Sequence, residues 1–204
     1  LEHPQAAQAQ LKRDSGATVI IHSADLSDAQ AALTLVDTAE REGGAIDILV
    51  NSAGAAQVMP FAELSPAAWQ AAMQAKFFSY INVTDPLIKR MGARGQGAVV
   101  NVIGMGGKVA TIHHIAGGSA NAALMLSTVG LAAAYAPMGV RVNAVNPALT
   151  LTERAAASIA ADARQRHVSE EEALRQAQSR APLGRLAHPQ DIADVVVFLA
   201  SPRA

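Results

Sequence analysis

Residues 97–124 hold candidate side chains for proton transfer, but glycines occupy positions where a nucleophile or an acid could stand. An apolar, β-branched run ends in a Gly-Met-Gly-Gly stretch that begins at Gly104, and His113 and His114 follow in a loop. Because an imidazole titrates near neutral pH, His114 could act as an acid or a base. Lys108, in the same loop, could supply positive charge. The alternative is that these side chains lie on an exposed loop and face water.

Composition limits the other chemistries available to this chain. Half of its 204 residues are hydrophobic, and only 3% are aromatic. The formal net charge of −1 and the scarcity of aromatic side chains argue against nucleic-acid binding. The chain has no cysteine, so disulfides and thiolate metal sites are excluded, and we predict no metal site. We find no apolar run approaching the roughly 20 residues of a membrane span, and we expect a cytoplasmic protein without membrane contact.

The elements that must position these side chains alternate along the chain. Short apolar runs, as expected for strands covered on both faces, occupy residues 17–23, 45–54, 97–104 and 139–147. Helical stretches between them cover residues 27–42, 66–91 and 119–136. The first follows the capping residues Ser27-Asp28, and the second follows Ser65-Pro66. This alternation indicates right-handed crossovers and a parallel sheet, and therefore an α/β fold.

The pattern changes after Pro147. The charged segment that follows predicts two helices joined near residues 167–169, and a last helix begins near His188-Pro189. Residues 150–185 are interpreted as a helical flap on the substrate side of a site, or alternatively as a solvated helical face. No repeat or low-complexity linker divides the chain, so residues 1–204 are predicted to form a single domain.

Several motifs fall in an order that resembles the short-chain dehydrogenase/reductase family. They are "DLSD" at 25–28, "NSAG" at 51–54, "VVNV" at 99–102, "GVRVNAVNP" at 139–147 and "PLGRLAHPQDIADVVVFLAS" at 182–201. The resemblance covers essentially the whole chain. It implies a Rossmann-like, three-layer αβα fold with a parallel sheet. It also implies NAD or NADP as cofactor and a small carbonyl or alcohol substrate.

The resemblance implies that the adenosine half of the cofactor lies against the first two of these motifs. Asp25 would accept a hydrogen bond from the adenine amino group, with Leu26 packed beside the ring. A compatible alternative is that Asp25 or the neighbouring serine caps the next helix. Asn51, Ala53 and Gly54 would lie beside the cofactor ribose, where small residues let the backbone approach a ligand closely. Asn51 could instead tie neighbouring strands together.

The resemblance also implies a nicotinamide contact after the last predicted strand. The segment from Pro147 to Thr152 would pass over the nicotinamide ring. The backbone of Thr150 and the hydroxyl of Thr152 would hold its carboxamide. Without the resemblance, this segment is only a turn from a strand to a helix.

The residues that carry catalysis in the family are changed in this sequence. The family has a serine after the "VVN" strand, a tyrosine thirteen residues later and a lysine four residues after that. These positions fall on Gly104, Gly117 and Asn121, and a fourth position, usually asparagine, falls on Lys76. Glycine has no side chain to move a proton, and asparagine has no charge to tune a neighbour. The family's usual proton relay is therefore lost.

Two classes of function remain open. In an NAD(P)-dependent oxidoreductase, proton transfer could move to His114, Lys76 or water, although Lys76 could equally be a salt-bridged or snorkelling lysine. Alternatively, the chain is a non-catalytic nucleotide-binding or scaffolding protein. In both cases we expect a homodimer or homotetramer formed through helices 66–91 and 119–136, because the family commonly pairs these helices across a two-fold axis.

The printed sequence has no glycine-rich phosphate loop ahead of residues 17–23, and it lacks the family's first two strands and last strand. Such a loop presents backbone N–H groups to the cofactor pyrophosphate. Three explanations are open: the sequence is part of a longer protein, it is a truncated product, or a rearrangement or second copy fills the gap. We do not expect these 204 residues alone to complete the family sheet, because its interior would hold unpaired backbone groups.

Overall fold

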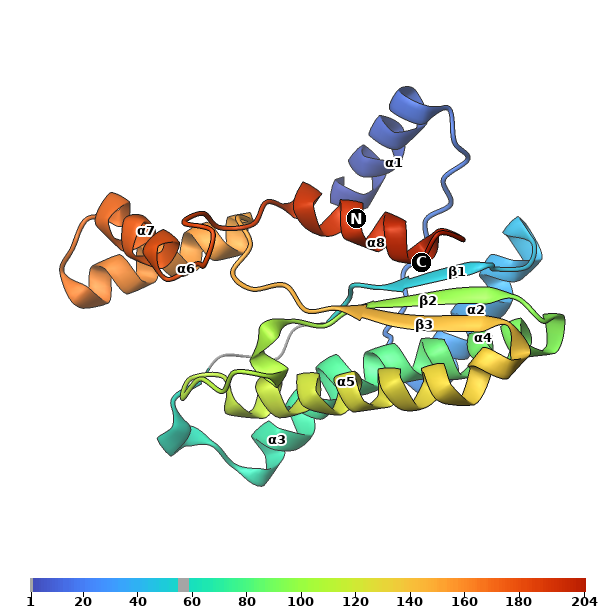
Figure 1. Cartoon of the computed structure of the whole chain (residues 1–204), viewed down its shortest axis with the longest axis horizontal. Helices are drawn as coiled ribbons and strands as arrows, with labels where there is room; N and C mark the ends of the chain where they lie inside the picture. The colour runs from blue at the N-terminus through green and yellow to red at the C-terminus, as the bar shows by residue number, and fades with distance from the viewer. Residues whose placement is uncertain (1, 55–58) are drawn as a thin grey trace.

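A three-stranded parallel sheet forms the centre of the computed structural model, which describes residues 2–54 and 59–204 (Figure 1). The strands lie in the order β1-β2-β3 and are β1 (Ile48–Asn51), β2 (Gly97–Val102) and β3 (Val140–Val145). Asn51 is in register with Asn101, and Val102 with Val145, so all three strands end at the same edge of the sheet. Three of the four predicted strands are confirmed, with shorter bounds.

Helices cover both faces of the sheet and complete a Rossmann-like arrangement (Figure 1). α4 and α5 pack on one face, with α2 beside α4, and α8 packs on the other face against β2 and β3. The α-helices are α1 (Glu2–Ser15), α2 (Ala29–Gly43), α3 (Pro66–Ala72), α4 (Ser79–Arg94), α5 (Ile115–Tyr135), α6 (Glu153–Arg166), α7 (Glu170–Ser179) and α8 (Pro189–Ala200). Shorter helical turns are η1 (Phe61–Glu63), the π-helical η2 (Met73–Phe78), η3 (Met105–Gly107) and η4 (Ala136–Met138).

Polar side chains fix the starts of four helices. Asp28, Ser65, Thr152 and Ser169 each accept the backbone N–H of the residue three positions later, at the starts of α2, α3, α6 and α7. These bonds satisfy N–H groups that have no partner within the helix. α8 starts at Pro189, where the sequence predicts it.

Aliphatic side chains form the core that holds α4 on the sheet. Val99, Val140 and Val142 from the strands pack with Ile88 and Met91 from α4. All five are buried, and a fully buried side chain of this kind contributes about 1.5–3 kcal/mol to folding. The position of α4, and of the π-helical turn that precedes it, is therefore set by the core.

Residues 17–23 do not form the strand that their apolar, β-branched sequence predicts. A strand is held by hydrogen bonds to a neighbouring strand, and in the described part of the chain no strand lies beside this segment. Other contacts hold it instead. The side chain of Gln8 donates to the carbonyl of Val19 at 2.6 Å, and His22 Nε2 lies 3.5 Å from a carboxylate oxygen of Glu42.

The helix predicted over residues 66–91 is continuous but not uniform. It runs through α3, η2 and α4 and ends at Arg94. A π-helical turn inserts an extra residue into a helix and is frequent at functional sites. Lys76 lies within this turn. The hydrophobic pattern of the sequence does not indicate the π-helical turn.

α5 begins at Ile115 rather than near Ser119, so Gly117 lies in its first turn. With η4 it forms the stretch Ile115–Met138, which is long and apolar enough to cross a membrane by length and composition. The expectation that no run of this kind exists was therefore wrong. Its apolar character has another explanation, because α5 packs on β3 and buries residues as far along as Thr128.

α6 and α7 pack against each other and extend away from the sheet (Figure 1, orange). The two helices join at His167, which has a left-handed backbone conformation with φ of 54°. Residues 150–185 thus contain the predicted pair of helices. The role of this pair as a flap stays a prediction.

Candidate active site

Hydrogen bonds between four side chains cross the carboxyl ends of β1 and β2. Asn51 Nδ2 donates to Thr84 Oγ1 of α4 at 2.9 Å and to Asn101 Oδ1 at 2.8 Å. Asn101 Nδ2 donates in turn to Thr128 Oγ1 of α5 at 3.0 Å. All four side chains are buried, so each bond satisfies groups that water does not reach. We call this set the polar ladder, and it shows Asn51 tying strands and helices together.

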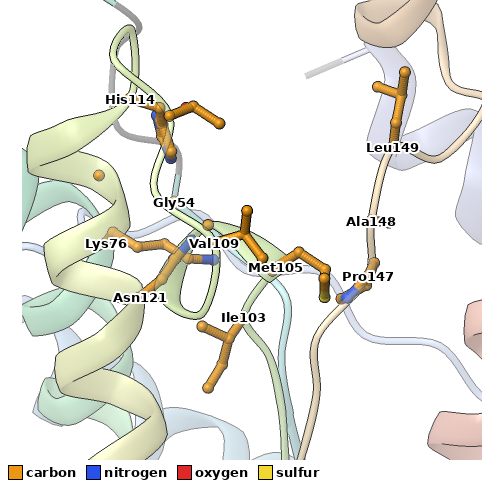
Figure 2. Close-up of a pocket in the computed structure, with 14 residues that line it drawn as sticks. Gly54, Lys76, Ile103, Met105, Val109, His114, Asn121, Pro147, Ala148 and Leu149 are labelled. Carbon is orange, nitrogen blue, oxygen red and sulfur yellow. The ribbon is translucent and has the colours of Figure 1, made fainter. Parts of the chain in front are cut away.

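A central cavity of about 540 Å³ opens beyond the carboxyl ends of β2 and β3 (Figure 2). Cavities at this edge of a parallel sheet are where α/β proteins bind their ligands. The lining residues that the sequence singled out are Gly54, Lys76, Gly104, His114, Gly117, Asn121 and Pro147. The others are Ile103, Met105, Gly106, Val109, Thr111, Ala148 and Leu149.

Lys76 reaches the central cavity from the π-helical turn and is 8% exposed. Its Nζ donates to Tyr80 Oη at 2.9 Å and to the carbonyl of Val102 at 3.3 Å, and it lies 4.4 Å from the centre of the Tyr80 ring. A snorkelling lysine would extend to solvent, and this one does not. Its ammonium ends beside the last residue of β2.

Tyr80 holds Lys76 in this position. Its hydroxyl donates to the carbonyl of Val102 at 2.6 Å while accepting from Lys76. Burial raises the pKa of Tyr80, so the phenol stays protonated and keeps both bonds. Tyr80 is not among the candidates from the sequence. Its position four residues after Lys76, on the same helical face, is the signal that could have identified it.

Asn121 extends from α5 toward the same end of β2. It is 6% exposed, and among the described residues nothing forms a hydrogen bond with its carboxamide. A Cβ added to Gly104 or to Gly106 would lie 3.4 Å from its Nδ2. A Cβ at Gly106 would also lie 3.2 Å from Cδ2 of His114, so the two glycines and the His114 imidazole border the Asn121 amide.

Glycines also let the loop after β2 pack directly on α5. A Cβ on Gly107 would lie 2.7 Å from the backbone nitrogen of Ala122, and one on Gly118 would lie 2.7 Å from the carbonyl oxygen of Gly106. Real Cβ atoms do not approach so closely. The glycine runs in this part of the sequence are thus required by backbone-to-backbone packing.

The remaining candidates near this loop differ in their positions. His114 lies just before α5, is half-buried and lines the central cavity. His113 and Lys108 are exposed and are not among the lining residues. Within the described chain, no group of three or more histidine and acidic side chains is placed to hold a metal ion.

A second cavity, of about 370 Å³, contains the residues expected at the adenosine end of the cofactor. Asp25, Leu26, Ala53 and Gly54 line it together. Asp25 Oδ1 accepts from the hydroxyl of Ser27 at 2.6 Å and from its backbone N–H at 2.9 Å. These two bonds lower the pKa of Asp25, which keeps it ionised as an acceptor. The next helix is capped by neither Asp25 nor Ser27, but by the aspartate that follows.

A third cavity, of about 410 Å³, lies between the sheet and α8 and contains Pro147, Thr150 and Thr152. The hydroxyl of Thr152 accepts the backbone N–H of Ala155 at 3.2 Å, and so caps α6. The hydroxyl of Thr150 donates to the carbonyl of Ala148 at 3.1 Å. Both hydroxyls therefore take part in local bonds, and both residues still face a cavity.

The three cavities are neighbours that share lining residues. Gly54 lines both the second and the central cavity, and Pro147 lines both the central and the third. Gly54 packs on the backbone of the π-helical turn, where a Cβ would overlap the carbonyl of Ala75. An extended ligand with a donor at one end for Asp25, such as a dinucleotide, fits this arrangement. Its pyrophosphate has no assigned partner among the described residues.

Residues 104–116 and 150–180 contribute differently to the central cavity. The first range supplies several of its lining residues, whereas among the described residues none from 150–180 lines it. The lining ends at Leu149, because α6 and α7 turn away from the sheet after it. The position of the flap relative to a substrate therefore stays a prediction.

Comparisons with known proteins agree with the fold. The family model described as enoyl-(acyl carrier protein) reductase matches residues 2–204. The chain is 34% identical to a D-threitol dehydrogenase from Mycolicibacterium smegmatis, over 100% of its own length and 74% of that protein. It is 33% identical to a cis-4-hydroxycyclohexanecarboxylate dehydrogenase from Sinomonas cyclohexanicum, over 94% of this chain and 73% of the relative.

A solved structure shows the same arrangement of elements. It is an NADPH-bound short chain oxidoreductase from Pseudomonas aeruginosa, described as containing an atypical catalytic center. It superposes with a TM-score of 0.86 at 32% identity, over 98% of this chain and 77% of that one. Fold and relatives together define a Rossmann-like oxidoreductase class of protein. More particularly, the chain belongs to the short-chain dehydrogenase/reductase family.

The backbone at Gly104 predicts the effect of restoring the family serine. Gly104 has φ of 125° and ψ of 149°, a region that is essentially restricted to glycine. We expect Gly104→Ser to lower the free energy of unfolding by about 1–3 kcal/mol, measured by urea denaturation. Gly130→Ser is the matched control, because position 130 is an exposed position in α5 with open space around a Cβ. Equal stability of the two variants would contradict the expectation.

Proposed function

We propose that the protein is an NAD(P)-dependent oxidoreductase that interconverts a carbonyl compound and an alcohol, with Lys76 as the proton donor. The observation that carries this proposal is the buried lysine side chain that lines the central cavity, fixed by Tyr80 and by the carbonyl of Val102. An ammonium group can protonate an alkoxide as it forms. Gly104 and Gly117 have no side chains that could do so.

The cofactor assignment rests on the three neighbouring cavities. Asp25 and Leu26 would hold the adenine, Ala53 and Gly54 would lie beside the ribose, and residues 147–152 would contact the nicotinamide. When bound, the reduced nicotinamide supplies a hydride to the carbonyl carbon. The relatives support this class of reaction, because the two enzymes named above are dehydrogenases and the solved neighbour is bound to NADPH. Both NAD and NADP remain candidates.

Residues of this chain are assigned to positioning of the proton donor, to proton transfer and to exclusion of water. Tyr80 and Val102 keep the Lys76 nitrogen at the end of β2, inside the cavity. Lys76 gives its proton to the substrate oxygen during reduction and takes one back during oxidation. His114 lines the same cavity and is the alternative donor. Once a ligand covers them, the apolar side chains around the cavity would limit the access of water to the transferred proton.

Removal of the Lys76 charge tests the assignment. We expect Lys76→Met, which keeps the length of the side chain, to lower kcat by about 10²–10⁴-fold with ketone substrates, because general acid catalysis contributes about that much. The rate is followed by oxidation of NADH or NADPH, and nucleotide affinity by nicotinamide fluorescence. Affinity should stay within about threefold of the wild-type value, which shows that the fold is intact. Lys108→Met, at an exposed lysine outside the cavity, is the control and should leave kcat unchanged.

Other outcomes of the same experiment would exclude the proposal or assign the proton donor to another residue. No binding of either reduced nucleotide at millimolar concentration by the full-length protein would exclude the oxidoreductase. An effect of His114→Gln in place of Lys76→Met would make His114 the donor. Nucleotide binding without turnover of any ketone would favour the second candidate, a non-catalytic nucleotide-binding protein. The glycines at positions 104 and 117 are the observation that favours this candidate.

We also propose that two copies pair through α4 and α5. Leu126 and Val129 are 75% and 66% exposed, and their spacing puts them on one face of α5. Covering such side chains stabilises an interface. We expect a homodimer or homotetramer in solution scattering at micromolar concentration, and monomers for the Leu126→Lys/Val129→Lys double variant. Leu183→Lys, at an 82% exposed leucine between α7 and α8, is the control. A monomeric wild-type protein would contradict the pairing.

A further inference from the structure

The central cavity has a polar side and an apolar side. Lys76, His114 and Asn121 enter it from the helical side, and the segment after β3 faces them (Figure 2). Side chains of Met105 and Val109 lie between the two sides (Figure 2). The apolar lining residues are Ile103, Met105, Val109, Pro147, Ala148 and Leu149.

Several side chains on the apolar side of the cavity are unusually exposed to solvent. Met105, Val109 and Leu149 are 38%, 55% and 43% exposed, although each borders the cavity. Exposed apolar side chains that gather around a cavity mark a place where a ligand covers them. They offer no hydrogen bonds to a ligand. A molecule with many hydroxyl groups would leave most of those groups without partners on this side.

The polar lining side chains are Lys76, Thr111, His114 and Asn121. Asn121 is 6% exposed, and its carboxamide lines the cavity without a hydrogen bond to the described residues, so it can donate to a ligand. Gly104, Gly106 and the His114 imidazole border this amide, and all three residues line the same cavity. The Lys76 nitrogen lies at the end of β2, two residues before Gly104. A ligand oxygen near this point would accept from both side chains.

We infer that the cavity binds a largely apolar ketone, whose single oxygen accepts hydrogen bonds from the Asn121 carboxamide and the Lys76 ammonium. Its hydrocarbon part lies against Met105, Val109 and Leu149. The binding part of this inference stands on the cavity alone, whereas reduction of the ketone rests on the proposed function. Sugars and polyols are the substrates that this cavity disfavours. The role of Asn121 is to hold the substrate oxygen, a role that the family's lysine pattern does not give it.

A series of ketones of increasing length tests the apolar side. 2-Butanone, 2-pentanone and 2-hexanone are titrated by ligand-observed NMR into the full-length protein, with and without NADP⁺, so that no reduction occurs. We expect the Kd to fall by about fourfold for each added methylene, the effect of burying one CH₂ group. Xylitol is the polar comparison and should bind more weakly than 2-butanone.

Two variants and a control assign the contacts. Val109→Thr keeps the shape of the side chain and should weaken 2-hexanone more than 2-butanone. Val197→Thr, at a 68% exposed valine on α8, is the matched control and should change neither. Asn121→Leu should weaken both ketones by a similar factor, on the order of tenfold, because both lose the same hydrogen bond.

Three outcomes would overturn the inference: a Kd that does not depend on ketone length, xylitol binding as tightly as 2-hexanone, or equal effects of the two valine variants. Failure of the proposed function is seen separately. If the ketones bind as expected but no reduced nucleotide binds, the oxidoreductase assignment fails and the ligand class stands. If a reduced nucleotide binds but the Kd does not change with ketone length, the inferred ligand class fails and the oxidoreductase assignment stands.

Discussion

The polar ladder is the interaction on which the site depends. Thr84, Asn51, Asn101 and Thr128 join α4, β1, β2 and α5 through buried hydrogen bonds. Loss of one partner would leave a buried polar group unsatisfied, at a cost of about 1–3 kcal/mol. The same two helices carry the polar groups of the central cavity. Asn121 precedes Thr128 by two helical turns on one face of α5, and Lys76 lies in the π-helical turn that leads into α4.

The second constraint is the close approach of the loop after β2 to α5. Gly107 and Gly118 permit contact between the two backbones, and Gly104 adopts a conformation that other residues avoid. The family pattern has a serine at position 104, whereas here the backbone itself favours glycine. The predicted replacement of the family's serine, tyrosine and lysine would therefore be more than a deletion of side chains. The loop after β2 and α5 pack closely on each other, and the side chains of Lys76 and Asn121 are buried beside this contact.

Much of the fold could be predicted from the sequence, because it depends on local patterns. The runs that became β1, β2 and β3 were recognisable from consecutive β-branched residues, and the starts of α2 and α3 from their capping residues. The segment at residues 17–23 has the same local pattern but no neighbouring strand, a property that its own sequence does not contain. The π-helical turn and the direction of α6 and α7 are likewise set by packing between distant residues.

For the candidate site too, some features could be predicted from the sequence and others depend on packing between distant residues. The spacing of the family motif located Gly104, Gly117, Asn121 and Lys76, and these four residues line one cavity. Neither the bond from Lys76 to Tyr80 nor the place of the Asn121 amide in the cavity follows from spacing, since both depend on which way a side chain turns. The apolar side of the cavity was also missed, because its exposed side chains come from two loops that meet only in the folded chain.

We propose that Lys76 and Asn121 together hold a ketone oxygen. The most direct measurement is the ¹³C NMR shift of 2-hexanone, labelled at its carbonyl carbon, bound to the protein with NADP⁺. Two donors on the oxygen polarise the carbonyl, so we expect its signal to lie downfield of its position in water. Lys76→Met and Asn121→Leu should each move the signal back upfield. A signal at the position found in an apolar solvent, or one that neither variant changes, would contradict the claim.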